Sequence, residues 1–179
     1  MDQPTSLLLG SLVLSRPVAA LATTHDGKPF ASMIPYAVLG LRRPLEPAAS
    51  QATGPGLVLV THVSRLSAHT RDMLAAPDVC LLIMAPDRAE DDAAAVPQSL
   101  PRVSLPCLAT FISPEHEAYA ACRDAYLTKF PYAAEWFQLG DFSLVVFTPT
   151  SARLIAGFAR AMTLSPHQLH AAVVAAAEA

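Results

Sequence analysis

The sequence predicts a mainly β fold, a small barrel with a few peripheral helices. Six or seven short apolar runs of strand length are separated by tight-turn signals, and few segments have a helical pattern. Strands and helices do not alternate strictly, and no Gly-x-Gly-x-x-Gly follows a strand, which argues against a doubly wound parallel sheet. At 179 residues we expect one domain over 1–179, with its barrel core at about 16–160.

The first half of the chain is expected to supply one helix at 5–14, starting near Thr5 or Ser6, and four strands. The strands are predicted at 18–23, 30–38, 57–61 and 79–84. Asp26-Gly27 predicts a hairpin turn between the first two, because this pair accepts positive φ. Pro35 cannot donate to a ladder and marks an edge or a bulge. The strand at 79–84 has no polar alternation, so we expect it to be buried on both faces.

The second half is expected to supply three strands and three helices, with loops at 42–56 and 87–101 preceding it. The strands are predicted at 102–111, 142–147 and 152–156. Ser113-Pro114, followed by acidic residues, predicts a helix that runs to about Thr128. A short helix at 132–137 and an Ala-rich helix at about 165–177, beginning near Ser165-Pro166, complete the prediction.

Composition narrows the function classes. Hydrophobic residues make up 53% of the chain and charged residues 15%, which suggests that a partner subunit covers part of the surface. A net charge of −3 and a pI of about 6.0 argue against nucleic-acid binding. The early apolar run is too short to span a bilayer and lacks a preceding basic residue, so we expect no membrane association and no secretion signal. Cys80, Cys107 and Cys122 lack metal-ligand spacing and are expected to be free thiols in a cytoplasmic protein.

The most distinctive segment, 61–72, is Thr-His-Val-Ser-Arg-Leu-Ser-Ala-His-Thr-Arg-Asp. It follows a buried strand and turns into a helix that runs through Leu74. Hydroxyls, imidazoles and guanidiniums at a helix N-terminus suit a phosphate group. The alternative is a polar helix start capped by Ser64 or Ser67, with Arg65 and Arg71 solvated. Because His69 stands beside Ser67 near the end of the strand, we favour the anion site.

Other polar positions are less specific. Ser32 and Arg102 lie on predicted strands, where a surface role is the alternative to ligand binding. His167 and His170 are three residues apart on the last helix, a pattern that is typical of solvent-exposed histidines and predicts no metal site. Trp136 and its aromatic neighbours are expected to be packing residues, although one of them is placed where it could border a ring-shaped ligand.

The order of motifs resembles a known family. The segments are Ala20-Leu21-Ala22-Thr23, Asp26-Gly27-Lys28-Pro29, Ala31-Ser32, Ser67-Ala68-His69-Thr70-Arg71-Asp72-Met73-Leu74, Arg102-Val103-Ser104-Leu105, Lys129-Phe130-Pro131, Asp141-Phe142 and 156–161. Together they span about 6–165 and resemble the FMN-binding split-barrel superfamily, specifically the pyridoxamine 5′-phosphate oxidase-related proteins of the HugZ-like haem-utilisation branch.

This resemblance implies a six-stranded split β-barrel homodimer with two FMN sites at the subunit interface. Residues that would bind the cofactor are carried over from the motifs: Ser32 and Met33 on the second strand, Thr61 and His62 at the end of the third, Ser67, His69, Arg71 and Arg102. Ser67 matches a phosphate-binding serine of the family, and His69 stands where the oxidases use lysine. Arg102 falls near the position of a side chain that in relatives approaches the flavin ring.

The departures from the family pattern matter as well. Ala68 and Ser32 stand where the oxidases have arginines, which argues against pyridoxal phosphate synthesis and implies weaker phosphate binding. Larger haem-utilisation proteins carry a haem-ligating histidine in an additional C-terminal region. The leading hypothesis is therefore an FMN-dependent oxidoreductase with a small-molecule redox substrate and no identified catalytic residue. The alternative is a non-enzymatic haem- or flavin-binding protein, or a haem-degrading HugZ-like protein.

Overall fold

The structure, a computed structural model, describes residues 1–41, 56–86, 97–158 and 160–179. Apart from their last residues, the loops predicted at 42–56 and 87–101 lie outside this part of the chain. The described strands are β1 Val18–His25, β2 Lys28–Pro35, β3 Ala37–Leu41, β4 Gly56–Ser64, β5 Asp78–Met84, β6 Arg102–Ile112, β7 Phe142–Pro149, β8 Ala152–Ile155 and β9 Ala161–Leu164. The described helices are α1 Gln3–Ser15, α2 Ala68–Ala75, α3 Tyr119–Lys129 and α4 Pro166–Ala177, with 3-10 turns η1 Pro97–Ser99 and η2 Pro131–Gln138.

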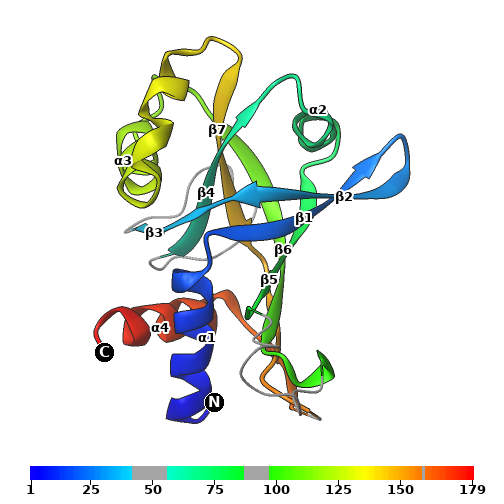
Figure 1. Ribbon diagram of the computed structural model, residues 1–179, viewed down its shortest axis with the longest axis vertical. Coiled ribbons are helices and arrows are strands. Elements are labelled where there is room, and N and C mark those ends of the chain that lie inside the picture. Colours follow the sequence, from blue (N-terminus) through cyan, green and yellow to red (C-terminus); the bar gives the residue numbers. More distant parts are fainter. Residues whose placement is uncertain (42–55, 87–96, 159) are drawn as a thin grey trace.

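The strands form an antiparallel barrel. Neighbouring strands follow the order β2-β1-β5-β6-β7-β4-β3, and the two ends of this order, β2 and β3, are separated in the chain only by Tyr36. The path therefore closes on itself as a six-stranded barrel in which β2 and β3 act as one bent strand. β8 and β9 extend the sheet beside β6 (Figure 1). The predicted mainly β fold with peripheral helices is confirmed.

The β1–β2 hairpin has the predicted turn. His25 pairs with Lys28, so only Asp26 and Gly27 form the loop, and their φ angles are 49° and 73°. Positive φ at both central residues is the type I′ geometry that matches the twist of the flanking strands. Pro35 ends β2 immediately before the bend at Tyr36, which agrees with its predicted place at an interruption of the ladder.

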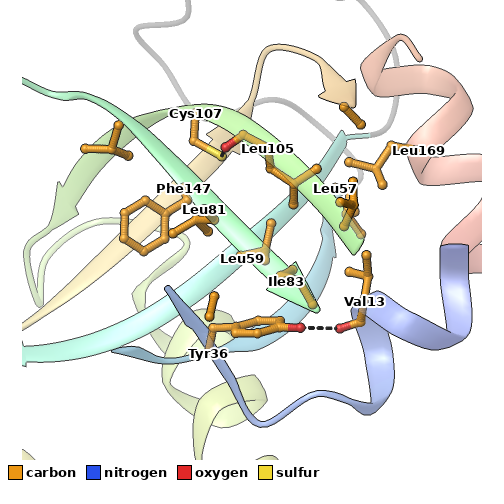
Figure 2. Packing of buried hydrophobic residues seen from close by; sticks show 14 of the residues in the cluster. Val13, Tyr36, Leu57, Leu59, Leu81, Ile83, Leu105, Cys107, Phe147 and Leu169 are labelled. Atoms are coloured by element: carbon orange, nitrogen blue, oxygen red, sulfur yellow. Dashed lines mark hydrogen bonds between the residues drawn. The ribbon is translucent and has the colours of Figure 1, made fainter. Parts of the chain in front are cut away.

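The main core fills the barrel and continues beneath it. Leu59, Leu81 and Phe147 are fully buried inside, and α1 and α4 lie together at one end of the barrel (Figure 1). Tyr36 spans the two regions, since its hydroxyl donates to the carbonyl oxygen of Val13 at 2.8 Å near the end of α1 (Figure 2). Gly10 allows α1 and α4 to touch, because a Cβ there would lie 2.1 Å from the Ala172 carbonyl oxygen.

A second, smaller core lies on the outer side of β4 and β7. Figure 1 shows α3 beside β4 and β7 on this side. Cys122 and Tyr126 of α3 pack against Val58 and Val146 of the strands, and Ala133 of η2 belongs to the same cluster, against which Phe137 packs. The lysine that ends α3, Lys129, donates to the carbonyl oxygens of Leu14 at 3.2 Å and Arg16 at 2.6 Å. α3 is therefore tied to the end of α1 as well as to the barrel.

Two helix starts differ from the prediction. The side chain of Asp2 caps α1 by accepting from the Thr5 amide at 2.8 Å, so α1 begins two residues before the expected Thr5. The helix predicted from Ser113-Pro114 begins only at Tyr119. The backbone there makes successive tight turns, in which His116 N–H donates to the Ser113 carbonyl and the His116 ring accepts from the Ala118 amide. In contrast, α4 begins as predicted, with a capping box between Ser165 and Gln168.

The prediction that residues 79–84 are buried on both faces is wrong for the single chain. In β5 the side chains of Val79, Leu81 and Ile83 are buried, whereas Cys80 and Leu82 are half-exposed and Met84 is 41% exposed. The exposed side of β5 is part of a larger surface that also includes β2, β1 and β6, which we call the outer face. Residues paired directly across neighbouring strands point to the same side of the sheet, so the strand register identifies the members of this face. The outer face includes Ala20, Ala22, Ala31, Met33, Cys80, Leu82, Met84, Ser104 and Pro106, together with the polar Thr24 and the charged Asp78 and Arg102.

Three further features of the structure bear on the predictions from the sequence. Cys80, Cys107 and Cys122 are free thiols, as predicted. The short strand β9 has no counterpart among the predicted elements. No helix in the described residues is long and apolar enough to cross a membrane.

Candidate functional site

The predicted anion-binding segment forms the junction between β4 and α2. Its hydroxyls converge on one carbonyl: Ser67 and Thr70 each donate to the Ser64 carbonyl oxygen at 2.7 Å. The Ser67 and Thr70 oxygens are 2.8 Å apart, and the Ser67 oxygen is 3.1 Å from Nε2 of His69. We call Ser67, His69, Thr70 and Arg71 the α2 cluster. The structure thus places the predicted Ser67 and His69 in direct contact.

Ser67 occupies the N-cap position of α2, but its hydroxyl accepts from no helix amide. The predicted alternative of a side-chain cap from Ser67 is therefore wrong, because its hydroxyl is engaged by the Ser64 carbonyl. Ser64 instead accepts from the Leu66 amide at 3.1 Å and donates to Asp141 at 2.7 Å, before the helix begins. The first-turn amides of α2 lack a side-chain cap from Ser67, which suits an external anion.

The charge of the α2 cluster is low. Burial lowers the pKa of His69, although the nearby Asp72 carboxylate opposes this shift, so the imidazole is neutral at pH 7. Arg71 is exposed. The cluster therefore offers hydrogen-bond donors and one permanent cation rather than a dense positive charge.

Sequence reasoning missed a buried contact directly behind this cluster. Asp72 is 4% exposed, accepts from the Thr23 hydroxyl at 2.8 Å and lies 2.6 Å from Nδ1 of His25. The hydrogen bond and charge of Asp72 raise the pKa of His25. Burial opposes ionisation of Asp72, but the bonds from His25 and Thr23 outweigh it and lower the pKa of the carboxyl. This contact fixes α2 against β1, and no motif signals it because its partners are 47 residues apart.

Ser32 lies on the side of the hairpin that faces α2. It pairs with Leu21, so its side chain shares one side of β1–β2 with Thr23, the residue that contacts α2. The Ser32 hydroxyl oxygen is buried and has no hydrogen-bond partner in the described part of the chain. Met33 points to the opposite side, on the outer face, and is 60% exposed. An orphaned hydroxyl beside α2 is consistent with a ligand-binding role for Ser32.

Thr61 and His62 are adjacent on β4, so their side chains lie on opposite faces. Thr61 donates to the carbonyl oxygen of Pro35 at 2.7 Å, which joins β4 to the end of β2. His62 points toward α3 and η2 instead, where its ring stacks on Phe137 with centroids 3.9 Å apart and planes 3° from parallel. The structure therefore does not bring Thr61 and His62 to one ligand on the same side of β4.

His62 lines a cavity of about 590 Å³. Desolvation by burial lowers the pKa of His62 to about 4, so the ring is uncharged at neutral pH. Its Nδ1 is buried and has no partner in the described residues. This cavity lies beneath α3 and η2 and was not predicted from the sequence.

Arg102 is remote from the α2 cluster within one chain. It begins β6 and donates from Nη1 to the carbonyl oxygens of Gln98 at 3.2 Å and Leu100 at 3.0 Å. β6 is separated from β2 by β1 and β5 in the sheet. Neighbouring strands lie about 4.8 Å apart, so β6 and β2 are separated by about 14 Å. Arg102 therefore cannot touch a ligand bound at Ser32 of the same chain.

The C-terminal histidines form no metal site with other groups. His167 is exposed, and His170 is half-buried on the same helix. No group of three or more His, Cys, Asp and Glu side chains in the described residues is placed to hold a metal ion.

Comparison with known proteins supports the fold and the expected resemblance. No family model matches the chain. The chloroplastic non-canonical haem oxygenase HOZ of Arabidopsis thaliana is 31% identical over 144 residues, which are 80% of this chain and 37% of that protein. A haem-binding protein from Mycobacterium smegmatis has a TM-score of 0.72 and 25% identity, over 96% of this chain and 61% of the mycobacterial chain.

A third similar protein carries an oxidase-family name. It is a Clostridium acetobutylicum protein of the pyridoxinephosphate oxidase family, with a TM-score of 0.60 and 10% identity, over 94% of this chain and 99% of that chain. The chain thus spans 37% of the curated relative and 61% of the mycobacterial protein. Its fold is therefore similar to that of a haem-binding protein and of a pyridoxinephosphate oxidase-family protein, and the curated relative it matches is named as a haem oxygenase.

Proposed function

We propose that this protein is a cytoplasmic FMN-binding flavoprotein that acts as an oxidoreductase on a small-molecule redox substrate. The observation that carries the proposal is the α2 cluster, whose hydroxyls and uncapped first-turn amides lie on the same side of the hairpin as the orphaned Ser32 hydroxyl. Hydroxyls and helix amides are the groups that bind a phosphate monoester. When bound, FMN would supply the redox chemistry, and the protein would supply orientation and exclusion of water.

The residues fit a phosphate, although with little positive charge. Ser32, Ser67 and the first-turn amides of α2 would donate hydrogen bonds to its oxygens, with the Ser67 hydroxyl turned from the Ser64 carbonyl to the phosphate, and Arg71 would supply the cation. His69 would contribute a hydrogen bond rather than a charge, because burial lowers its pKa. Met33, Thr61, His62 and Arg102 remain proposed cofactor contacts from the family resemblance, with Arg102 supplied by a second subunit.

A homodimer with the cofactor at the interface forms part of the same proposal. The centre of the outer face consists mainly of Ala, Met, Leu, Cys and Pro side chains, of which Ala20, Ala22 and Met33 are exposed, while Asp78 and Arg102 lie on the same face at opposite ends of the β5–β6 pair. An apolar sheet face without a covering helix is typical of an interface. Covering it with a second copy would bury both sides of β5, as the sequence predicts, and would bring a partner's residues to the cofactor.

The test is an FMN titration of purified protein, followed by flavin fluorescence and calorimetry. We expect binding of one FMN per chain, loss of affinity in Ser67→Ala, and no change in Ser11→Ala, an exposed serine of α1. His69→Lys restores the lysine of the oxidases and should tighten binding about tenfold, the value of one charge-assisted contact. Protein that takes up no FMN, in wild type and in His69→Lys alike, would refute the flavin assignment.

A second candidate is a haem-binding or haem-degrading protein. Two of the relatives described above are named as haem proteins, and the low charge of the α2 cluster favours a less phosphate-dependent cofactor. His167 and His170 are the proposed axial ligands, since both are at least partly accessible on α4. A Soret band on haem titration that is lost in His167→Ala or His170→Ala would support this candidate. A Soret band that is unchanged in both variants would exclude these two ligands, and no band at all would exclude haem.

A further inference from the structure

The cavity beside His62 is formed by rings from four parts of the chain. Phe111 at the end of β6, Tyr119 of α3, Phe137 of η2 and Phe142 at the start of β7 all line it. Its volume of about 590 Å³ lies in the range of sites for small organic molecules. None of the α2 cluster lines it, so it is separate from the proposed phosphate site.

One wall of the cavity is built from aromatic rings in contact with one another. Phe137 is stacked on His62 on one side, and the guanidinium carbon of Arg123 lies 5.5 Å from the centre of the Phe137 ring. Phe142 leans against His62 with centroids 5.0 Å apart. These rings hold each other in place, and a wall of this kind favours planar aromatic ligands.

The imidazole in this wall has unused hydrogen-bonding capacity. His62 is 6% exposed, and its Nδ1 has no partner within the described residues. A polar atom buried without a partner is costly, and such atoms in native proteins usually meet a water or a ligand. Because the ring is neutral, it would serve as a hydrogen-bonding group and not as a cation for the ligand.

The positive group of the cavity is Arg65. Its backbone amide is anchored to the Asp141 carbonyl oxygen at 2.7 Å, whereas its exposed guanidinium makes no ion pair or hydrogen bond with any described residue. The apolar side chains of Leu74 and Leu139, which are 63% and 48% exposed, also line the cavity. A ligand with an apolar ring and one anionic group therefore matches the lining.

We propose that this cavity is a second ligand site, which binds a planar aromatic carboxylate with its ring against the His62–Phe137–Phe142 wall and its carboxylate on Arg65. The site does not depend on the proposed phosphate contacts, since Ser32, Ser67, His69 and Arg71 take no part in it. It shares only His62 with the cofactor contacts that the family resemblance implies. If the protein binds neither FMN nor haem, this proposal still stands. If it binds no aromatic carboxylate, the proposed function still stands.

The test uses 2-naphthoate as the probe and 2-naphthalenemethanol as its neutral counterpart, with the 179-residue chain purified without cofactor. Trp136 is the only tryptophan of the chain and lies 6.2 Å, centre to centre, from Phe142, so its fluorescence reports on occupancy. Isothermal titration calorimetry gives the stoichiometry. We expect one naphthoate per chain and weaker binding of the alcohol.

Three variants and one control, Arg153→Gln, separate the contributions. Arg65→Gln should weaken naphthoate about tenfold and leave the alcohol unchanged, while Arg153→Gln, an exposed arginine on β8, should change neither. His62→Phe keeps the ring stack and removes the nitrogens. Gly140 lines the cavity, and a Cβ there meets no atom within 4 Å, so Gly140→Leu adds bulk at this wall without a clash and should weaken binding of both probes without lowering the melting temperature.

Several results would overturn the proposal. No naphthoate binding up to about millimolar concentration excludes a site of this class. Equal affinity of wild type and Gly140→Leu would place the probe elsewhere. Equal losses for Arg65→Gln and Arg153→Gln would show that the carboxylate senses only the general charge of the surface.

Discussion

Replacing Gly10 by alanine tests how closely α1 and α4 pack. In an exposed helix this change stabilises a protein by up to about 1 kcal/mol, because glycine loses more backbone freedom on folding. Here a Cβ would lie 2.1 Å from the Ala172 carbonyl oxygen and 2.5 Å from the Cβ of Ala176. Carbon atoms in contact are about 3.5 Å apart, so the two helices would have to separate by about 1 Å.

Forcing extra volume into a packed contact costs about 1–3 kcal/mol. Both obstructing groups belong to the opposite helix, and one of them is backbone, so we take the upper half of that range. After the gain in helix propensity, Gly10→Ala should lower the free energy of unfolding by about 1–2 kcal/mol. For a chain of this size the melting temperature should fall by about 3–6 °C.

The assay is thermal and urea unfolding followed by circular dichroism, with Ser11→Ala as the control. Ser11 is the next residue of α1 and is exposed, so its variant should lie within about 0.5 kcal/mol of wild type. A melting temperature of Gly10→Ala equal to or above that of wild type would refute the close α1–α4 packing.

Three further predictions concern the rest of the chain. Tyr36→Phe leaves the buried Val13 carbonyl without its donor and should cost about 1–2 kcal/mol in urea unfolding; no measurable change would mean that another group satisfies this carbonyl. The His25–Asp72 ion pair should stabilise the protein fully from above the ordinary carboxyl pKa to below the ordinary imidazole pKa. The pKa of His25 is raised and that of Asp72 is lowered, so the greater free energy of unfolding of wild type over His25→Gln should shrink as pH rises through the raised His25 pKa. It should also shrink as pH falls through the lowered Asp72 pKa. A difference in stability that does not depend on pH would contradict the ion pair. Met33→Glu should convert the proposed dimer to monomers in light scattering, whereas Lys28→Glu, at an exposed residue of the hairpin, should not. If both variants remain dimers, the outer face is not the interface.

Local signals in the sequence predict the elements that local chemistry determines. The Asp26-Gly27 turn and the Ser165 capping box were both predictable, because each needs only neighbouring residues. Ser113-Pro114 carries a similar helix-start pattern but does not begin a helix. There the His116 side chain accepts a backbone bond and the chain turns tightly instead, a competition that propensity does not resolve.

Burial on both sides of a strand was harder to predict from one chain. The apolar residues of β5 cannot show whether their second face is covered by the same chain or by another. An apolar run indicates that both sides of a strand are covered in the assembled protein. The single chain covers one side of β5, and in the proposed dimer a second chain would cover the other.

The candidate site was predictable in part. Ser67 and His69 are close in sequence, and they meet in the structure. The opposite orientations of Thr61 and His62 follow from strand alternation alone. The contact of Asp72 with His25, and the stacking of His62 on Phe137, join distant segments and required the fold.

The contacts around the end of α1 have a consequence for how this protein opens. Lys129 of α3 holds the carbonyls of Leu14 and of the C-cap residue Arg16, and Tyr36 at the barrel's bend holds the carbonyl of Val13 in the same last turn of α1. The helix therefore has no stable end of its own, because side chains up to 115 residues away complete it. Amide hydrogens in the last turn of α1 should exchange with solvent only when the barrel itself opens, so this N-terminal helix would behave as part of the most slowly exchanging unit of the molecule.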